Sequence, residues 1–248
     1  MRKPFTLHIY EDGAAFNQAA AKLLTNLAQE AVAQHGRFSL ALCGGGTPTE
    51  VYKLLAERPY CDEMPWQQTH LFWGDERLVP PDDPGSNYGQ VARLLLNKVP
   101  VPSENIHRAR GEWEMETAVA DYIEQLRPFA NENEPPVLDL ILLGMGSDGH
   151  TASLFPGSPV QESEWVIGVT ADYDGRPAQR LSLTPQVINC ARHVIFLVTG
   201  HSKAETLQNV LYGPHQPETL PAQRIQPVNG TLTWLTDTAA AQHLSQLT

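Results

Sequence analysis

Short apolar runs alternate with longer mixed segments along most of the chain. Runs of five or six residues rich in Val, Ile, Leu and aromatic side chains are typical of strands. The run at 138–143 is apolar at nearly every position, as expected for a strand that is covered on both faces. The pattern predicts strands at 6–10, 38–43, 69–73, 138–143, 165–170, 179–183, 193–198 and 231–235.

Most of the segments between these runs carry helix signals. Asp12 is a suitable N-cap for an Ala-, Leu- and Gln-rich helix that ends near Gly36. Thr47 can cap a second helix, because Pro48 suits a first turn. Asp237 is expected to cap a final helix near the C-terminus. The helix after Thr47 is expected to end at about 57, and further helices are expected at 87–97, 112–129 and 202–211. The segments 79–85 and 99–111 are expected to be irregular.

This alternation is typical of an α/β fold with a mainly parallel sheet wrapped by helices. Residues 165–183 hold two strands with no helix between them, so a small antiparallel excursion is expected there. No internal repeat, low-complexity tract or long linker divides the sequence. We therefore expect residues 1–248 to form one α/β domain.

The composition is ordinary for a globular protein, with 42% hydrophobic and 18% charged residues. The net charge of -11 argues against a general nucleic-acid binder, which needs a basic face, but allows a small anionic substrate. Cys43, Cys61 and Cys190 lack the spacing of a disulfide framework or a zinc site. The first residues lack the apolar run of a signal peptide, and no stretch approaches a membrane span, so a cytoplasmic protein is expected.

Polar, glycine-rich sequence follows four of the predicted strands. In an open α/β sheet, ligands bind beyond the carboxyl ends of the strands, so the coincidence of four such segments matters more than any one of them. The segments are 44–48, 74–77, 144–150 and 199–203.

The first segment, Gly44-Gly45-Gly46-Thr47-Pro48, lies between a strand and a helix. Glycines let the backbone approach a ligand closely, and the amides at a helix start attract anions. A glycine-rich tight turn is the alternative, but three successive glycines are more than a turn needs. The segment fits neither a P-loop nor the dinucleotide fingerprint. We interpret it as a phosphate-binding loop.

The segment Gly74-Asp75-Glu76-Arg77 places three charges directly after an aromatic strand. By itself it could be a surface salt-bridge turn. Beside the other loops, Arg77 becomes a candidate for binding anionic oxygen, and Asp75 for holding a sugar hydroxyl or orienting a side chain.

The segment 144–150, GMGSDGH, carries the sharpest signal. A histidine near neutrality is the obvious general base, so His150 is the leading candidate, and Asp148 could fix its tautomer or meet substrate hydroxyls. A loop histidine bonded only to backbone is the plainer alternative. A serine nucleophile elbow around Ser147 lacks its first glycine, and Asp148 and His150 lack the further ligands of a metal site.

Two basic residues complete the candidate chemistry. Lys203 lies near a helix start, where a cation is disfavoured by the helix dipole unless it meets a bound anion. Arg180, on the strand at 179–183, is a second candidate partner for a phosphate. A charge-assisted contact of this kind stabilises a bound anion by roughly 1.5–3 kcal/mol.

The combination of these motifs resembles the glucosamine-6-phosphate isomerase/6-phosphogluconolactonase family, on its lactonase side. The resemblance extends from about residue 38 to 207, and the tail after 219 also fits. It rests on LALCGGGTPTEVYKLL, HLFWGDERLVPPDDPGSNYGQ, LDLILLGMGSDGHTASLFPGSP, RLSLTPQVIN and VTGHSKAETL, in that order.

The resemblance implies a three-layer α/β/α fold and hydrolysis of 6-phospho-D-glucono-1,5-lactone without a metal or organic cofactor. It places the catalytic histidine at His150 and an active-site pair at Asp75 and Arg77. Phosphate contacts fall on the glycine loop, on Lys203 and on Arg180. The partner is then a small sugar phosphate, with the protein a monomer or weak homo-oligomer and no nucleic-acid or membrane partner.

Two alternatives remain. The related glucosamine-6-phosphate deaminase/isomerase carries a glutamate five residues after the histidine, where this chain has Phe155. A non-catalytic sugar-phosphate sensor usually has an added DNA-binding helix-turn-helix, and no basic helical extension is visible here. Both alternatives are therefore disfavoured.

Overall fold

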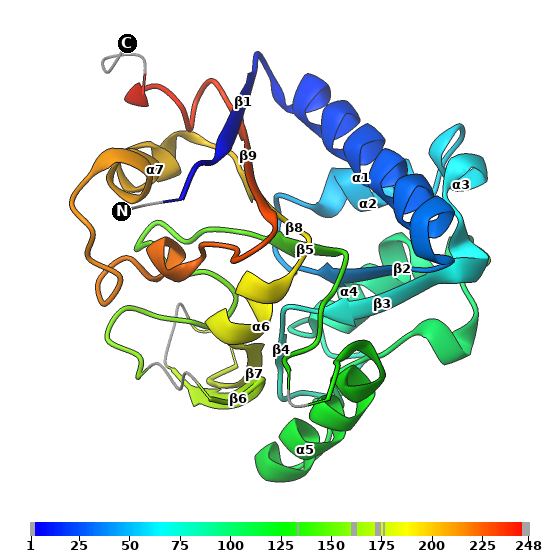
Figure 1. Cartoon of the computed structure of the whole chain (residues 1–248). Coiled ribbons are helices and arrows are strands. Elements are labelled where there is room, and N and C mark those ends of the chain that lie inside the picture. The colour runs from blue at the N-terminus through cyan, green and yellow to red at the C-terminus, as the bar shows by residue number, and fades with distance from the viewer. Residues whose placement is uncertain (1–2, 133, 160–162, 172–174, 176, 245–248) are drawn as a thin grey trace.

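A six-stranded sheet runs through the centre of the computed structural model (Figure 1), which describes residues 3–132, 134–159, 163–171, 175 and 177–244. All five strand pairings in this sheet are parallel, as predicted. The spatial order is β1 (Thr6–Tyr10), β9 (Thr231–Asp237), β8 (His193–Val198), β5 (Leu140–Leu143), β2 (Phe38–Leu42) and β3 (Thr69–Trp73).

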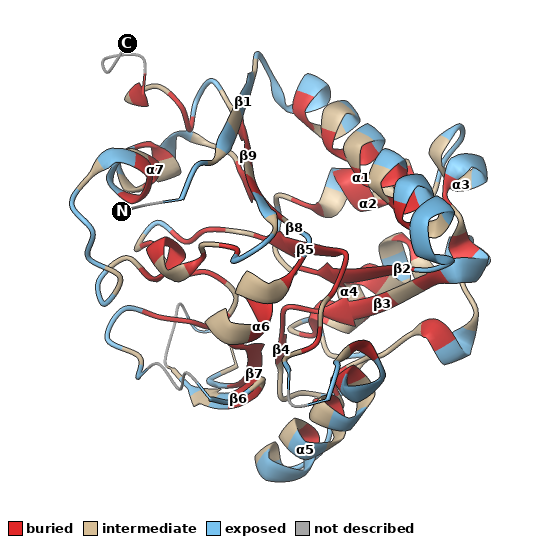
Figure 2. Ribbon diagram, viewed as in Figure 1, coloured by how far each residue is buried: buried red, intermediate tan, exposed pale blue. Residues whose placement is uncertain are grey.

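Alternate residues of the central strands pack into two separate hydrophobic clusters, one on each face of the sheet. In β5, Leu140 and Leu142 pack on one side, while Ile141 and Leu143 pack on the other. All four are buried, which confirms that this strand is covered on both faces (Figure 2). The strand is apolar at every position because neither face meets water.

Helices supply the outer layers of the fold. The first face is covered by α1 (Gly13–His35), α2 (Thr49–Leu55) and α4 (Asn87–Leu94), and the second by α5 (Met115–Leu126), α6 (Pro185–Cys190) and α7 (Ala204–Tyr212). The expected three-layer α/β/α fold is therefore confirmed, with one addition on the second face. The short segments are α3 (Tyr60–Glu63), η1 (Trp66–Gln68), η2 (Leu96–Lys98), η3 (Ser103–Asn105), η4 (Arg127–Phe129), η5 (His201–Lys203) and η6 (Pro221–Arg224).

The addition is a small antiparallel sheet of three strands, in the order β4 (Asp75–Arg77), β7 (Gln179–Leu183) and β6 (Val166–Thr170). The antiparallel excursion expected at 165–183 is confirmed. The segment after Trp73, for which a surface salt-bridge turn was the alternative, forms a strand that pairs with β7. Leu181 and Leu183 of β7 pack into the core below, which holds this sheet against the central one.

Helix boundaries were predicted best where capping is local. Asp12 accepts a hydrogen bond from the Ala15 amide at 2.8 Å, and Gly36 ends α1 in the left-handed conformation. Thr47 does not cap α2: Pro48 holds the cap position, and Thr47 Oγ1 contacts Thr199 Oγ1 instead. The helix expected after Asp237 is wrong for the described residues, where 238–243 form turns, although Asp237 Oδ1 accepts the Ala240 amide at 2.8 Å as a capping residue would.

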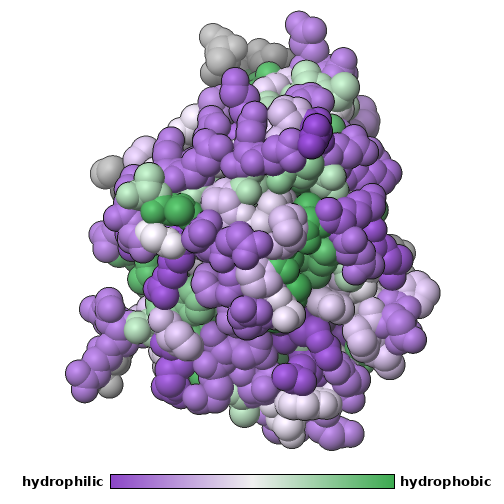
Figure 3. Space-filling view, turned by 90° about the vertical axis from the view of Figure 1, so that its right-hand side faces the viewer, coloured by the Kyte–Doolittle hydropathy of each residue, from purple (hydrophilic) through white to green (hydrophobic). Residues whose placement is uncertain are grey.

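The outer surface is largely polar. On the face seen from the right-hand side of Figure 1, hydrophilic residues dominate, and apolar residues gather only in small patches (Figure 3). Among the described residues, no helix is long and apolar enough to cross a membrane.

Candidate active site

A cavity of about 370 Å³ lies at the carboxyl ends of β2, β3, β5 and β8. It is lined by all four strand-end segments, which confirms that the fold brings them together. Three cations, Arg77, Arg180 and Lys203, line it against one carboxylate, Asp75, so the cavity is locally positive in a chain of net charge -11. Nine of the ten candidate residues line this cavity: Gly44, Gly45, Gly46, Thr47, Asp75, Arg77, His150, Arg180 and Lys203.

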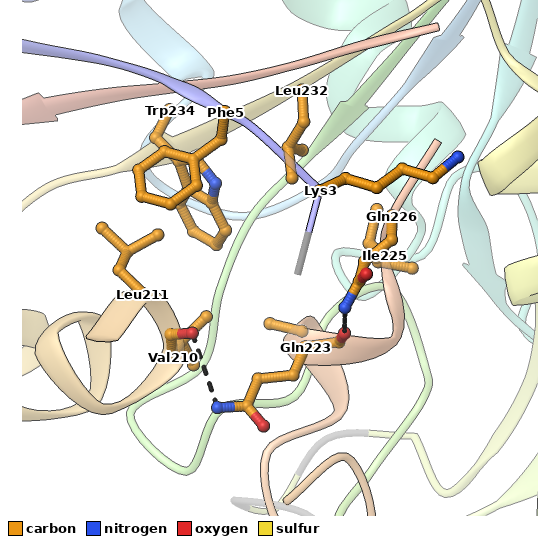
Figure 4. A pocket seen from close by; sticks show the side chains of 10 residues that line it. Lys3, Phe5, Val210, Leu211, Gln223, Ile225, Gln226, Leu232 and Trp234 are labelled. Atoms are coloured by element: carbon orange, nitrogen blue, oxygen red, sulfur yellow. Dashed lines mark hydrogen bonds between the residues drawn. The ribbon is translucent and has the colours of Figure 1, made fainter. Parts of the chain in front are cut away.

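Two of the other hollows formed by the described residues differ from this cavity in chemistry. An apolar cavity of about 30 Å³ between α7, η6 and β9 is lined by residues such as Val210, Leu232 and Trp234 (Figure 4), and it is too small for a sugar. A groove of about 660 Å³ beside α6 includes Arg224, but this guanidinium already donates to the Pro217 carbonyl and pairs with Glu218. We therefore place the candidate site at the strand ends.

The tenth candidate, Asp148, stands beside His150 rather than on the cavity wall. Its Oδ1 lies 2.6 Å from His150 Nδ1 and also accepts the His150 backbone N–H at 3.1 Å. Burial opposes ionisation of Asp148, but the hydrogen bond and charge of His150 outweigh it and lower the pKa of this carboxyl. An ionised Asp148 makes Nδ1 the protonated nitrogen, so Nε2 is the atom that can accept a proton from a ligand.

The backbone of the loop after β5 shapes this pair. The Gly146 amide donates to the His150 carbonyl at 2.8 Å, which closes the loop on itself. A Cβ at Gly146 would overlap both the imidazole and the Asp148 carboxylate, so only glycine fits beneath them. Ala152 follows with φ 48°, a conformation that L side chains rarely adopt. Such strain beside a reactive group is typical of functional loops.

Asp75 is held at the cavity wall by two donors that sequence reasoning missed. Ser153 Oγ donates to its Oδ2 at 2.7 Å, and Asn87 Nδ2 donates to its Oδ1 at 3.2 Å and to its carbonyl oxygen at 2.8 Å. A Cβ at Gly44 would overlap the Asn87 amide, so the first glycine of the loop makes room for this contact. The polar Ser86-Asn87 pair at the start of a predicted helix was the available signal.

Glu76, between Asp75 and Arg77, is buried and serves the scaffold. Its two carboxylate oxygens accept from the backbone amides of Arg77, Asn87 and Tyr88 and from Ser86 Oγ. Burial raises the pKa of Glu76 to about 7 against the opposing effect of these amide donors. The carboxylate ties β4 to the first turn of α4 and thereby aims Asn87 at Asp75.

Two buried tyrosines fix the strand ends beneath the cavity. Tyr52 donates its hydroxyl proton to the Cys43 carbonyl at 2.7 Å and accepts the Cys43 amide at 3.1 Å. Tyr122 makes the same pair of contacts with Trp73, both at 2.7 Å. Each hydroxyl satisfies the backbone at a point where the sheet ends, so the loops that follow start from fixed positions.

Arg77 and Arg180 face each other across the antiparallel pair of β4 and β7. Like charges on directly opposed residues destabilise a sheet, which favours a bound anion between them. Arg77 Nη1 donates to the Gly85 carbonyl at 2.5 Å, and the Arg180 guanidinium lies over the Phe155 ring, 5.1 Å from its centroid. Arg77 and Arg180 are 103 positions apart in the chain, so their pairing could not be predicted from the sequence.

A side-chain contact joins the glycine loop to the segment that leads to Lys203. Thr47 Oγ1 lies 3.3 Å from Thr199 Oγ1, which joins the loop after β2 to the end of β8, and Lys203 follows in η5. The amide of Gly45 donates to Gln90 Oε1 at 3.1 Å, so this glycine is braced by a side chain that the sequence did not single out. Among the described residues, no group of three or more His, Cys, Asp or Glu could hold a metal ion.

The fold and the site together define an α/β protein with a carboxylate–histidine pair at a cavity lined by three cations. A family model described as glucosamine-6-phosphate isomerases/6-phosphogluconolactonase matches residues 11–234. The chain therefore belongs to this family, as the resemblance of its motifs predicted.

Individual relatives fall on both branches of the family name. A 6-phosphogluconolactonase from Haemophilus influenzae is 40% identical over 205 residues, which cover 83% of this chain and 87% of the relative. The structure of a 6-phosphogluconolactonase from Trypanosoma cruzi has a TM-score of 0.86 and 28% identity, covering 99% of this chain and 98% of its own. A monomeric glucosamine-6-phosphate deaminase has a TM-score of 0.83, 21% identity and coverages of 96% and 99%, which shows a shared fold alone.

Proposed function

We propose that the protein hydrolyses 6-phospho-D-glucono-1,5-lactone to 6-phospho-D-gluconate, in the oxidative pentose phosphate pathway. The observation that carries this proposal is the Asp148–His150 pair, with its 2.6 Å contact, at a cavity lined by three cations. A general base near neutrality and a positive pocket are what hydrolysis of a phosphorylated lactone requires. The 40% identity to a protein named 6-phosphogluconolactonase supports the same reaction.

The mechanism uses His150 twice. Its Nε2 removes a proton from water while the water oxygen forms a bond to the lactone carbonyl carbon. The carbonyl electron pair moves onto oxygen, and the Arg77 guanidinium stabilises the resulting oxyanion. On collapse, the bond from this carbon to the ring oxygen breaks, and His150 returns the proton to that oxygen. Asp148 keeps Nδ1 protonated and stabilises the imidazolium between the two transfers.

We assign the substrate phosphate to the side of the cavity formed by the glycine loop and Lys203. Lys203 supplies the charge, and the backbone around Gly46 and Thr47 supplies donors at the start of α2. Gly44 and Gly45 shape the loop through their contacts with Asn87 and Gln90. The bound phosphate holds the lactone carbonyl next to His150, and this orientation raises the rate of the chemical step.

Lactone hydrolysis, corrected for spontaneous ring opening, tests the proposal. His150→Ala should lower kcat sharply with little change in KM, because the base is lost while the phosphate contacts remain. Lys203→Ala should mainly raise KM. A His150→Ala enzyme with the wild-type kcat would remove His150 as the base, and an unchanged KM would remove Lys203 from the phosphate site.

The deaminase alternative is disfavoured by Phe155. This side chain packs against the His150 ring, with 4.9 Å between centroids, so an aromatic ring occupies the position at which the deaminase would carry its acid. Ammonia release from glucosamine 6-phosphate measures this activity directly. Its absence alongside lactone hydrolysis separates the two enzymes, and absence of both would favour a sensor.

The setting of the enzyme follows from its surface and composition. We propose one catalytic domain over residues 1–248, acting in the cytoplasm on a small molecule as a monomer or weak homo-oligomer. The two hydrophobic clusters that share one sheet support a single folding unit, and the net charge of -11 disfavours nucleic acid as a partner. Light scattering across a range of concentrations tests this; a tight oligomer at every concentration would contradict it.

A further inference from the structure

The Phe155 ring contacts both the candidate base and a buried arginine. His150 packs against it in a tilted arrangement with centroids 4.9 Å apart, and the Arg180 guanidinium carbon lies 5.1 Å from the same centroid. Phe155 and Arg180 are 7% and 2% exposed, so the contact is shielded from solvent. His150 and Arg180 therefore share one aromatic neighbour, and both line the same cavity.

The small sheet places Arg180 in the same group as Asp75 and Arg77. Arg180 faces Arg77 in the register of β4 and β7, and Ser182, two residues along, faces Asp75. Ser182 Oγ accepts the amide of Ser153, whose own hydroxyl donates to Asp75. This network joins the small sheet to the loop that carries His150.

Lys203 and the Thr47–Thr199 contact belong to a different part of the cavity. Lys203 follows β8, while Arg77 follows β3, and β5 and β2 lie between these strands. Thr199 contacts Thr47 and so joins the end of β8, ahead of Lys203, to the glycine loop, whereas Arg180 lies over the Phe155 ring that also contacts His150 and faces Arg77 in the small sheet.

We propose that Arg180 acts at the reacting lactone end of the substrate, beside Arg77, and that Phe155 positions it there by stacking on both His150 and Arg180. The inference rests on the proposed lactonase function and assigns Arg180 away from the phosphate. A guanidinium buried in low dielectric stabilises the oxyanion that forms as water adds to the carbonyl.

Two substrates that differ only in the phosphate distinguish the roles of the cations. Arg180→Gln and Lys203→Gln are compared on 6-phospho-D-glucono-1,5-lactone and on D-glucono-1,5-lactone. Arg180→Gln should lower kcat on both by about 10²–10³-fold and preserve the ratio of their kcat/KM values within about threefold. Lys203→Gln should lower that ratio by about ten- to a hundredfold. A collapse of the ratio in Arg180→Gln would overturn the proposal.

Binding of inorganic phosphate provides a readout that does not depend on turnover. By calorimetry, Arg180→Gln should bind phosphate with the wild-type Kd within about threefold, which also shows that the variant is folded, whereas Lys203→Gln should bind at least tenfold more weakly. The reverse order would overturn the assignment. The binding experiment distinguishes the roles of Arg180 and Lys203 even if the enzyme does not hydrolyse the unphosphorylated lactone. Lack of lactonase activity in the wild type would refute the proposed function instead.

Phe155→Leu tests the positioning role. It should lower kcat on both lactones without changing the Kd of phosphate, and Phe155→Leu with Arg180→Gln should lose no more than about threefold beyond Arg180→Gln alone. If the loss of kcat in the double variant equalled the product of the two single losses, Phe155 would not act through Arg180. Arg224→Gln is the matched control: this arginine is also buried but binds Glu218 and Pro217, so its loss should lower stability and leave kcat on both substrates unchanged.

Discussion

Glu76 makes the stability of the protein depend on pH in an unusual direction. Burial raises its pKa from 4.5 to about 7, against opposing hydrogen bonds from the Tyr88, Asn87 and Arg77 amides. Between pH 4.5 and about 7, Glu76 is protonated in the folded protein and ionised in the unfolded chain. The contribution to stability is therefore complete below about pH 4.5 and is lost as pH rises through about 7. At about 1.4 kcal/mol per pH unit, the loss amounts to about 3 kcal/mol.

Glu76→Gln isolates this effect. Urea unfolding of the wild type and the variant between pH 5 and 8 should show that the variant lacks the downward slope of Glu76. The variant should also be about 1–3 kcal/mol less stable at pH 5, because its amide nitrogen cannot accept from the backbone donors that face both oxygens of the Glu76 carboxyl.

Glu124→Gln serves as the control. The hydrogen bond from Arg127 lowers the pKa of this exposed carboxyl, so the substitution should leave the downward slope in place. Equal slopes for Glu76→Gln and wild type would refute the reasoning, because they would mean that Glu76 does not titrate in this range.

Four further outcomes follow from the structure. Asp148→Asn should lower kcat by about 10²–10⁴-fold with little change in KM, because the amide no longer fixes the tautomer of His150; a wild-type kcat would contradict this. Gly146→Ala should lower stability by about 1–3 kcal/mol and kcat at least tenfold, in melts and steady-state assays, because the new methyl overlaps that pair. Asn87→Ala should raise KM or lower kcat and cost about 1–3 kcal/mol in urea unfolding, because Asp75 loses a buried donor; a neutral result would place Asp75 outside the site. Burial, and after it the charge of His70, lowers the pKa of His107 from 6.5 to about 4. The folded protein therefore favours neutral His107, and its stability should fall as pH drops from about 6.5 toward 4. His107→Asn should reduce that fall in acid unfolding curves.

Features set by neighbours in sequence were predictable. The cap at Asp12, the left-handed Gly36 and the fully buried strand Leu140–Leu143 each depend on residues within one turn or one strand. The pairing of Asp148 with His150 is also local, because two residues of a tight loop supply both groups. The failure at Thr47 has a tertiary cause, since its hydroxyl contacts Thr199 from another strand.

The details of the site depended on contacts between distant segments. Asn87 reaches Asp75 only because Glu76 anchors the start of α4, and Gln90 meets Gly45 across the cavity rim. No periodicity in the chain encodes such contacts. The strand at Asp75–Arg77 was missed for the same reason, because a three-residue strand becomes visible only through its partner β7.

The sequence by itself determined the α/β class, the four strand-end segments and the candidate base, because hydrophobic period and local loop chemistry are properties of contiguous residues. Only the tertiary structure decided which charges face one another. The register of β4 and β7 set Arg77 opposite Arg180, and the packing of the loop after β5 brought the Phe155 ring against both that second arginine and His150. Both depend on how remote segments pack, because a shift of one residue in register would turn the side chains to the opposite face of the sheet.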